Sequence, residues 1–310
     1  MSTTKAIRIH RFGGPEVLQF EDVTLPELAA DELLVRVHAA SVNPVDYKIR
    51  GGGYLPEDRL PVTLGRDLSG VVEARGDGLH SLAQGDAVYA MVGMDRGAYA
   101  QHVVVKTSEC ARKPASLDHD AAAAVPLAAL TAWRGLFDHG GLKKGERVLI
   151  HGGSGGVGHL AIQFATACGA HVITTVSADD IDFVRDLGAH EPIDYRAHRF
   201  EDEVGDVDLV FDLVAGETQD RSWQVLRREG GRLVSTLSEP DAGQARRHNA
   251  RTAHYMAHPD ADQLAGIARM IDDGRVRVVV ERTYVLDEAA DAQRHLENDH
   301  VRGKLVLRAA

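Results

Sequence analysis

The chain has 310 residues, of which 44% are hydrophobic and 26% are charged. This length suggests about two domains, and the composition is that of a folded globular protein, which excludes a disordered or fibrous chain. With 35 Lys and Arg against 46 Asp and Glu, the formal net charge of −11 disfavours non-specific binding to nucleic acid or to an anionic membrane. A small anionic cofactor is compatible with this charge, because a few backbone amides can hold a phosphate.

The cysteines and the first residues bear on the compartment. Cys110 and Cys168 are too few for a disulfide framework and form no Cys-x-x-Cys pair. Residues 1–14 contain scattered basic side chains and no apolar core of signal-peptide length. The apolar runs of the chain are too short to cross a bilayer. We therefore expect a cytoplasmic protein with neither a membrane nor a nucleic acid as partner.

Up to about residue 110, short apolar runs separated by Gly, Pro and Asp predict strands of an antiparallel barrel or sandwich. Examples are Leu33–Val37, Gly70–Val72, Ala87–Met91 and His102–Val105. An alanine-rich stretch over 118–138 then predicts helix and marks a transition. The first part of the chain is therefore expected to be mostly β.

From residue 147 onward, the sequence predicts strands that alternate with helices. Strands are expected at 148–150, 171–176, 207–214 and 232–235, and helices at 157–168, 177–188 and 217–228. Such alternation, with nearly continuous apolar strands, predicts a parallel sheet covered by helices on both faces.

After a helix predicted at 260–273, the pattern returns to β. Strands are expected at 276–280, 284–286 and 304–307, with a helix at 287–297. We expect this C-terminal part to rejoin the first domain. The predicted domains are thus residues 1–125 completed by 275–310, and an inserted nucleotide-binding domain at 126–274.

A glycine-rich motif lies between the first strand and the first helix of the predicted insert. Gly153, Gly155 and Gly158 have the G-x-G-x-x-G spacing of dinucleotide-binding proteins. These glycines permit a tight turn, close approach of the backbone to a pyrophosphate and packing of helix on strand, and the helix N-terminus offers free amides to phosphates. A plain flexible loop is the alternative, but the flanking strands and helix favour a cofactor site.

The end of the next strand bears on which dinucleotide is bound. NAD-selective sites usually place Asp or Glu there, about 20 residues after the first glycine, whereas this strand ends at Val176 and Ser177 without a carboxylate. Ser177 can bind a 2′-phosphate, although Asp179 and Asp180 would repel one. The alternative is a helix N-terminus that Ser177 caps and whose dipole favours the two acids, and both roles of Ser177 are compatible.

Several separated motifs carry a family resemblance. They are ASVNPVDYKIR at 40–50, LGRDLSG at 64–70, GDAVY at 85–89, HGGSGGVG at 151–158 and GKLVL at 303–307. In this order they resemble the zinc-independent quinone oxidoreductases of the medium-chain dehydrogenase/reductase superfamily, in the zeta-crystallin-like branch, over essentially the whole chain. The resemblance implies an α/β fold with a β-rich, GroES-like catalytic domain and a Rossmann domain, NADPH in the cleft between them, and a homodimer or homotetramer.

The resemblance also assigns residues to the site. The turn that binds the pyrophosphate corresponds to Gly153, Ser154, Gly155, Gly156, Val157 and Gly158. Ser177 and Tyr195 match positions that contact the adenosine phosphate and the adenine, and Thr131 matches a nicotinamide contact. Asn43 matches the active-site asparagine. NADPH is the expected cofactor, with NADH as the alternative.

Two departures from the family pattern bear on these assignments. Lys48 stands where the family often has an active-site tyrosine, with Tyr47 beside it, and acids follow Ser177 where the family often has a base. We expect Asn43 to orient the nicotinamide or the acceptor carbonyl, and Tyr47 or Lys48 to donate to a developing oxyanion. The alternatives are a turn role for Asn43 before Pro44 and a solvated Lys48.

A metal site is not expected. The zinc alcohol dehydrogenases of the superfamily have a cysteine where Asn43 stands and Gly-His-Glu in place of Gly65-Arg66-Asp67, and their structural zinc needs four clustered cysteines. His254 and His258 have i, i+4 spacing, but they lie far from these motifs and are expected to be surface or packing residues.

The sequence leads to one function and two alternatives. Without a Lewis acid, an already electrophilic, conjugated acceptor is the easier hydride acceptor, and the protein contributes positioning and hydrogen bonds. We expect NADPH-dependent reduction of a quinone. The alternatives are an enone or 2-alkenal double-bond reductase on the same scaffold, and a non-enzymatic, crystallin-like NADPH-binding protein.

Overall fold

The computed structural model describes residues 2–78 and 81–309, so the outer ends of the predicted catalytic domain, residues 1 and 310, lie outside it. The chain divides into two compact units. Unit 1 comprises Met1–Leu127, His258–Gly274 and Val278–Ala310, and unit 2 comprises Ala128–Ala257 and Arg275–Arg277. The predicted α/β class, with a GroES-like part and a Rossmann part, is confirmed.

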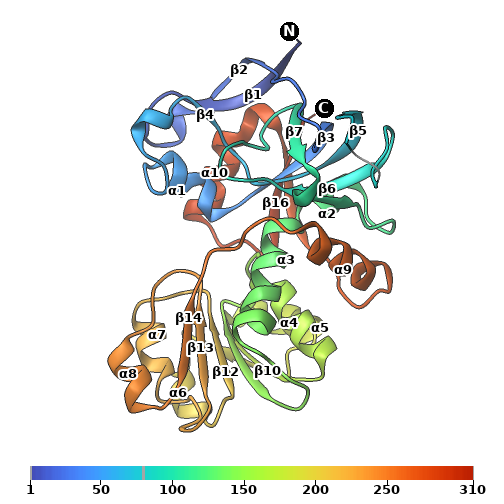
Figure 1. The fold of residues 1–310 in the computed structure, drawn as a ribbon. Helices are drawn as coiled ribbons and strands as arrows, with labels where there is room; N and C mark the ends of the chain where they lie inside the picture. The colour runs from blue at the N-terminus through green and yellow to red at the C-terminus, as the bar shows by residue number, and fades with distance from the viewer. Residues whose placement is uncertain (1, 79–80, 310) are drawn as a thin grey trace. The chain divides into compact units, whose positions relative to one another are not determined.

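Unit 1 is built on two sheets that enclose its core (Figure 1). The larger has the order β15-β16-β3-β5-β6-β8, with β7 paired to β3, and the smaller has the order β2-β1-β4. Their strands are β1 (Thr3–Ile9), β2 (Gln19–Thr24), β3 (Glu32–Val42), β4 (Val62–Thr63), β5 (Asp67–Arg75), β6 (Ala87–Met91), β7 (His102–Lys106), β8 (Cys110–Arg112), β15 (Val280–Val285) and β16 (Lys304–Arg308).

The C-terminal strand β16 lies between β15 and β3 in the larger sheet. β16, red in Figure 1, pairs antiparallel with β3, with Leu305 opposite Val42 and Arg308 opposite Ala39. The helices of unit 1 are α1 (Pro44–Arg50), α2 (His119–Ala123), α9 (Ala261–Asp272) and α10 (Ala289–Asn298). The expected return of the C-terminal residues to the β-rich part is thus observed.

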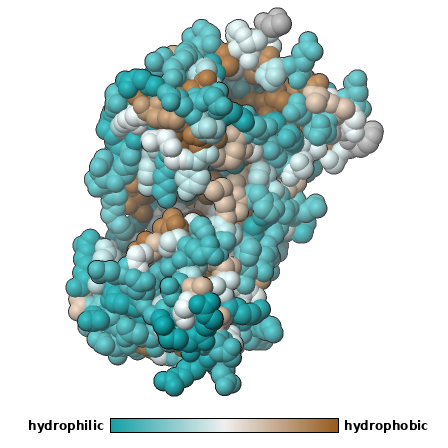
Figure 2. Space-filling view, turned by 60° about the vertical axis from the view of Figure 1, so that its left-hand side comes forward, coloured by the Kyte–Doolittle hydropathy of each residue, from teal (hydrophilic) through white to brown (hydrophobic). Residues whose placement is uncertain are grey.

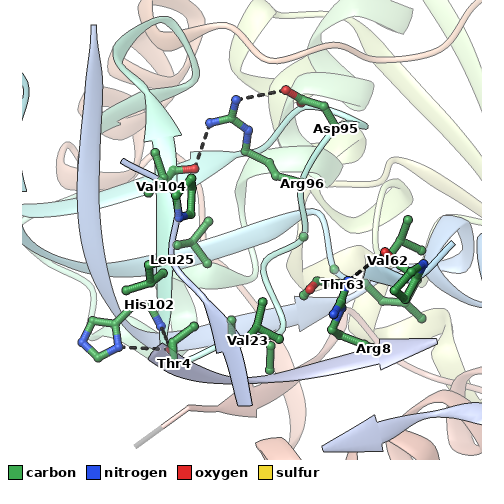
Figure 3. Close-up of a pocket in the computed structure, with 18 of the residues that line it drawn as sticks. Thr4, Arg8, Val23, Leu25, Val62, Thr63, Asp95, Arg96, His102 and Val104 are labelled. Carbon is green, nitrogen blue, oxygen red and sulfur yellow. Dashed lines mark hydrogen bonds and ion pairs between the residues drawn. The ribbon is translucent and has the colours of Figure 1, made fainter. Parts of the chain in front are cut away.

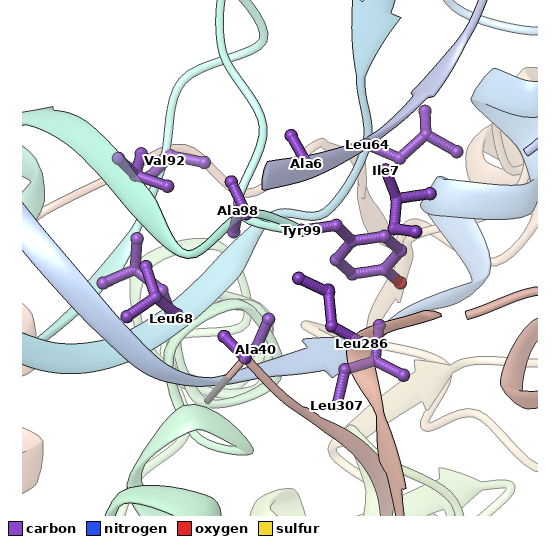
Figure 4. Close-up of a cluster of buried hydrophobic side chains, with 14 of the residues drawn as sticks. Ala6, Ile7, Ala40, Leu64, Leu68, Val92, Ala98, Tyr99, Leu286 and Leu307 are labelled. Carbon is purple, nitrogen blue, oxygen red and sulfur yellow. The ribbon is translucent and has the colours of Figure 1, made fainter. Parts of the chain in front are cut away.

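Buried aliphatic side chains surround one tyrosine in the core of unit 1 (Figure 4). Tyr99 is completely buried among residues that include Ile7, Leu64 and Leu307. Its hydroxyl, at the edge of the cluster, donates a hydrogen bond of 2.8 Å to Asp46. A buried phenol normally needs such a partner, so the apolar core also supports a polar group near α1.

Unit 2 contains a six-stranded, all-parallel sheet of order β11-β10-β9-β12-β13-β14. The strands are β9 (Arg147–His151), β10 (His171–Val176), β11 (Glu191–Asp194), β12 (Leu209–Asp212), β13 (Arg232–Ser235) and β14 (Arg251–His254). Counted from β9, the order is 3-2-1-4-5-6, that of a Rossmann fold, whose ligands bind outside the carboxyl ends of the strands where the order reverses. That point lies between β9 and β12.

The helices of unit 2 follow the strands as the periodicity predicts, with shorter spans in places. They are α4 (Gly158–Cys168), α5 (Ile181–Asp186), α6 (Phe200–Glu203), α7 (Glu217–Ser222) and α8 (Ala242–Arg247), and α3 (Pro126–Trp133) leads into the unit. The helix predicted at 217–228 ends at Ser222, because Val225 and Leu226 leave it to pack in the core, and Leu226 bridges Val207. The stretch at 118–138 divides into α2, α3 and a π-helix, Arg134–His139.

Residues 258–274, which the prediction placed in the nucleotide-binding domain, pack with unit 1 instead. Leu264 of α9 accepts a hydrogen bond through its carbonyl from the buried Tyr89 hydroxyl of β6, at 2.6 Å. Asp272 at the end of α9 accepts bonds from the backbone N–H groups of Ala115 and Ser116. These contacts correct the predicted boundary. The strand expected at 276–280 begins only at Val280, where pairing with Lys304 starts.

Hydrophilic side chains cover most of the face shown in Figure 2, with scattered hydrophobic patches. The larger apolar side chains are instead collected in buried clusters within each unit. Among the described residues, no helix is long and apolar enough to span a membrane.

Candidate active site

The glycine-rich loop occupies the ligand-binding position of the Rossmann sheet. It begins at Gly152, directly after β9, and ends where α4 begins at Gly158. The backbone of Gly152 adopts φ +76°, a left-handed conformation that favours glycine. β9 is the strand at which the sheet order reverses, so the loop lies at the end where such sheets bind nucleotides.

The three glycines of the motif are required for different reasons. A Cβ on Gly153 would lie 2.1 Å from the Thr174 hydroxyl oxygen, and one on Gly158 would lie 2.1 Å from the Gly152 carbonyl oxygen. Close packing inside unit 2 therefore demands glycine at both positions. A Cβ on Gly155 would meet nothing closer than that same carbonyl oxygen, at 3.6 Å. The fold leaves room for a side chain at Gly155, and a bound group that approaches the backbone would explain its absence.

Backbone donors of the loop support the same conclusion. The N–H groups of Ser154, Gly156 and Val157 have no hydrogen-bond partner among the residues that the structure describes. The loop precedes an 11-residue helix, whose dipole adds partial positive charge at this end. Unpaired N–H groups at a helix N-terminus form a preformed anion site. The predicted residues from Gly153 to Gly158 thus fit a pyrophosphate.

A buried histidine fixes the strand ends beneath the loop. The two ring nitrogens of His151 lie 3.0 Å from the Thr175 hydroxyl and 2.9 Å from the Ser222 hydroxyl. Burial lowers the pKa of His151 to about 4, so the ring is neutral at physiological pH. A neutral imidazole with both nitrogens occupied holds β9, β10 and α7 together immediately before Gly152.

Ser177 lies at the end of β10, as predicted, and already has a partner. Its hydroxyl donates a 3.0 Å hydrogen bond to the carboxylate of the buried Asp180. Ser177 also precedes the short turn Ala178–Asp180, where its extended backbone is that of a helix cap. Ser177 thus occupies the cap position through its backbone, but its side chain makes no cap hydrogen bond and donates to Asp180 instead. A phosphate role requires the hydroxyl to be shared.

Tyr195 is adjacent to Ser177 in space. The next residue, Arg196, is a basic side chain that sequence reasoning missed. The N–H of Tyr195 donates to the carbonyl of Val176 at 3.1 Å, and its side chain is 56% exposed. The guanidinium of Arg196 lies over the Tyr195 ring at 5.6 Å and donates to its hydroxyl at 3.3 Å. Hydrogen bonding to Tyr195 raises the pKa of Arg196, and the charge of Asp179 acts in the same direction. A cation therefore stands beside the end of β10 despite the acids at 179 and 180.

Thr131, the predicted nicotinamide contact, lies in α3 and is 7% exposed. Its carbonyl accepts a hydrogen bond from the buried hydroxyl of Tyr255, which follows β14. The structure thus anchors this part of α3 to the far end of the Rossmann sheet. Its role toward a cofactor stays a prediction.

Asn43, the predicted active-site asparagine of unit 1, is buried in a charged network. Its Nδ2 donates to the carboxylate of Asp67 at 2.8 Å, and its Oδ1 accepts a hydrogen bond from the ammonium of Lys304. Lys304 also donates to the carbonyl of Val42 at 2.7 Å, and Asp67 accepts from the Ser41 hydroxyl at 2.8 Å. These contacts fix the orientation of the Asn43 amide and occupy both its ends.

A second carboxylate joins this network through the start of α1. Asp46 accepts a 2.8 Å hydrogen bond from the N–H of Asn43 and another from the Tyr99 hydroxyl. Burial raises its pKa to about 7, so it is partly protonated near neutral pH. Burial also raises the pKa of Asp67 and lowers that of Lys304, in each case because the charged form is desolvated.

Tyr47 and Lys48 are not part of this network. Tyr47 is half-buried, and the pKa of its phenol is raised by burial and then by the charge of Glu297, which forms an ion pair with Arg50. Lys48 is partly exposed in the last turn of α1, and its carbonyl accepts from the N–H of Gly53. The structure therefore does not bring either side chain to Asn43. Their catalytic roles stay predictions.

The two histidines considered for a metal are both exposed. His254 is in β14 of unit 2 and exposed, whereas His258 belongs to unit 1 and its ring contacts the carbonyl of Pro259 at 3.2 Å. Within residues 2–78 and 81–309, no group of three or more His, Cys, Asp and Glu side chains is placed to hold a metal ion.

Comparison with known proteins bears on both units. Residues 29–115 match the alcohol dehydrogenase GroES-like domain, and residues 187–307 match the family described as zinc-binding dehydrogenase. The mouse mitochondrial NAD(P)H oxidoreductase RTN4IP1 is 36% identical, over 96% of this chain and 87% of its own length. A quinone oxidoreductase from Rattus norvegicus is 32% identical, over 97% and 95%. The chain belongs to the quinone oxidoreductase family of the medium-chain dehydrogenases/reductases.

Solved structures agree with this family. A quinone oxidoreductase from Coxiella burnetii has a TM-score of 0.92 and 34% identity, with all of both chains covered. The Escherichia coli quinone oxidoreductase, solved in complex with NADPH, has a TM-score of 0.89 and 29% identity over 99% of this chain and 100% of that one. A further relative of this chain is the chloroplastic NADPH-dependent alkenal/one oxidoreductase from Arabidopsis thaliana. It is 33% identical, over 96% of this chain and 77% of its own length.

Proposed function

We propose that this protein is an NADPH-dependent oxidoreductase that transfers hydride to a quinone without a catalytic zinc ion. The observation that carries the proposal is the loop of unit 2, where Gly155 leaves space for a ligand and the N–H groups of Ser154, Gly156 and Val157 are unpaired. The NADPH complex of the related Escherichia coli enzyme supports the same cofactor.

When bound, NADPH would supply the hydride. The loop N–H groups would hold its pyrophosphate, and Ser177, Tyr195 and Arg196 would face its adenosine end. Arg196 supplies the positive charge that a 2′-phosphate needs and that the acids at 179 and 180 do not. This cation favours NADPH over NADH.

The charges around Asn43 support chemistry without zinc. The ammonium of Lys304 contacts the Asn43 oxygen, and the guanidinium of Arg66 stands at the position of a zinc-binding histidine in the related alcohol dehydrogenases. Neither a guanidinium nor an amide that is bound at both ends is a zinc ligand, so these side chains do not form the ligand set of a catalytic zinc ion. Asp67 and Lys304 instead hold the Asn43 amide in one orientation, so that unit 1 contributes a rigid, prearranged polar surface.

The acceptor is a conjugated carbonyl compound. The rat and Coxiella relatives are named quinone oxidoreductases, which favours a quinone, and the Arabidopsis relative is named for alkenals and enones, which supports double-bond reduction as the second candidate. Homo-oligomerisation and a cytoplasmic location are kept as predictions.

Purified protein mixed with NADPH and a panel of quinones and enones tests the proposal. We expect loss of NADPH absorbance with 1,4-naphthoquinone, and product analysis would distinguish a hydroquinone from a saturated ketone. Addition of a chelator such as EDTA should leave the rate unchanged. Binding of NADPH without any turnover would refute both enzyme functions and favour the non-enzymatic alternative.

A further inference from the structure

A cavity of about 460 Å³ lies within unit 1 (Figure 3). Its walls come from β1, β2, β4, β7 and the loop at 94–97, which Figure 3 shows converging on one space. Much of the lining is apolar and includes Val23, Leu25, Ile49, Leu55, Met94 and Val104. Such walls suit the ring or chain of a small organic molecule.

Four arginines line this cavity, and their surroundings differ. Arg96 donates to the carbonyl of Val104 at 2.9 Å and to Asp95 at 3.0 Å, and Arg8 donates to the carbonyl of Pro61 (Figure 3). Arg59 is exposed to solvent, which can satisfy it. These three side chains therefore have protein or solvent partners without any ligand, although Nε of Arg8 is buried without one.

Arg66 is different because it is only 4% exposed and has no hydrogen bond or ion pair from its side chain within the described part of the chain. Its position is fixed by the backbone: its carbonyl accepts from the N–H of Val92 at 2.8 Å. It follows Gly65, whose φ of +92° and contact with the Tyr99 ring admit only glycine. Arg66 lines the cavity, and its nitrogens, which keep a small accessible surface, have no protein partner within the described residues.

The nearby carboxylates form no ion pair with Arg66, and most of their oxygens are bound elsewhere, Oδ1 of Asp46 being without a partner. Burial lowers the pKa of Arg66, and the negative charges of four carboxylates raise it: Asp46, Asp67, Glu109 and Asp95. None of them lies within ion-pair distance of its guanidinium. Asp67 accepts from Ser41, Asn43 and the N–H of Leu127, and Glu109 accepts from the N–H groups of Gly93 and Lys106. These acids offset the charge at a distance and leave the five N–H donors free.

We propose that this cavity binds a carboxylate and that Arg66 is the residue that recognises it. A buried, unpaired guanidinium is costly, and a planar carboxylate satisfies it through two parallel hydrogen bonds. The apolar walls would hold the remainder of the ligand. Resting on the proposed function, the favoured acceptor is a conjugated carbonyl compound that carries a carboxylate.

A binding experiment tests the site apart from catalysis. Titration of the full-length protein with benzoate, a carboxylate on one ring, should show binding to the wild type. Arg66→Gln should weaken it at least tenfold, while Arg36→Gln, which removes an exposed arginine paired with Glu73 outside the cavity, should not. Equal binding to wild type and Arg66→Gln, or no binding to the wild type, would overturn the proposal.

A kinetic experiment tests the acceptor class. With NADPH, the wild type should prefer a carboxylate-bearing 1,4-naphthoquinone over the matching carboxamide by at least tenfold in kcat/KM. The difference should come from a lower KM for the carboxylate. In Arg66→Gln the ratio should approach one, with the Kd for NADPH unchanged. A ratio near one in the wild type would refute the acceptor class. If no quinone is reduced at all, the proposed function fails, and benzoate binding still decides the site.

Thermal unfolding separates recognition from a structural role. If Arg66 serves the fold, Arg66→Gln lowers the midpoint; if it awaits a ligand, removal of an unpaired buried charge leaves the midpoint unchanged or raises it. Benzoate should raise the midpoint of the wild type and not that of Arg66→Gln. A lower midpoint together with unchanged benzoate binding would assign Arg66 to the fold alone.

Discussion

The glycine-rich loop of unit 2 and the network around Asn43 in unit 1 use polar groups in opposite ways. In the loop, the N–H groups of Ser154, Gly156 and Val157 are left without partners, and space is left at Gly155. In the network, the amide of Asn43 is bound at both ends, by Asp67 and by Lys304. The loop is built for a ligand to complete it, whereas the Asn43 amide is bound at both ends without one, and only Oδ1 of Asp46 is left without a partner among the network atoms that the structure describes.

This difference separates binding from positioning. Unpaired N–H donors that face water at the end of a sheet cost little stability, because water can bind them. They form hydrogen bonds with an anion when one binds. Buried charges must instead be matched within the protein, because desolvation penalises each one left alone. The network therefore supports a rigid surface, and changes there should affect stability first. Changes in the loop should affect cofactor affinity first.

Lys304→Met should have the largest effect on stability. It would leave the buried carboxylate of Asp67 and the oxygen of Asn43 without their cation, and removal of one partner of a buried charged group typically costs about 3–5 kcal/mol. Urea unfolding measures this loss. Lys48→Met, on a partly exposed side chain, is the matched control and should change the free energy of unfolding by less than about 0.5 kcal/mol. Wild-type stability in Lys304→Met would mean that the network is not self-contained.

Alanine at two glycines of one loop sharpens the comparison. Gly153→Ala should destabilise the protein by about 1–3 kcal/mol, because the new Cβ would overlap the Thr174 hydroxyl. Gly155→Ala should leave stability within about 0.5 kcal/mol of the wild type and weaken NADPH binding at least tenfold. Thermal unfolding and fluorescence titration with NADPH measure the two effects. Unchanged NADPH affinity in Gly155→Ala would remove the loop from the binding site.

Asp46→Asn tests the network through pH. The folded-state pKa of about 7 exceeds the ordinary value of 3.8, so the folded protein holds the extra proton between these values, and the free energy of unfolding falls as pH rises from about 4 to 7. Asparagine can keep the contacts with Asn43 and Tyr99 and has no charge to bury. Relative to the wild type, Asp46→Asn should therefore gain roughly 4 kcal/mol between pH 4 and pH 8. Denaturant unfolding at both values measures the gain. Parallel pH profiles would contradict the prediction.

Arg196→Gln should have a smaller and more selective effect. Loss of this exposed cation should weaken NADPH binding about tenfold, or about 1.4 kcal/mol, and leave NADH binding unchanged, because only NADPH carries the 2′-phosphate. Arg199→Gln, on an exposed arginine paired with Glu201, is the control. Dissociation constants for both nucleotides decide the matter, and an equal loss for NADPH and NADH would refute the assignment.

Local patterns predicted much of the fold. The strands at Ala87–Met91, His171–Val176 and Arg232–Ser235 were located residue for residue, since apolar runs between turn residues specify them. The glycine motif was found because its spacing reflects a local turn. Elements whose ends depend on tertiary contacts were not: α7 ends early where Leu226 reaches Val207.

The site residues that sequence reasoning missed are those defined by contacts distant in the chain. Lys304 meets Asn43 only because β16 pairs with β3, and nothing near either residue signals the other. The lack of partners around Arg66 is likewise a property of the folded cavity. Arg196 could have been found, because it directly follows Tyr195, whose position the family pattern had already marked.

The pairing of β16 with β3 also sets an order of events during synthesis. Residues 39–41 can pair with β5 soon after they emerge from the ribosome, but the other edge of this part of β3 lacks its neighbour until residues 305–308 have emerged. The whole of β9–β14 lies between these two segments and can complete its parallel sheet first. The nascent chain thus carries the whole glycine-rich loop and its sheet before unit 1 is completed, and Lys304, close to the end of translation, closes the network around Asn43.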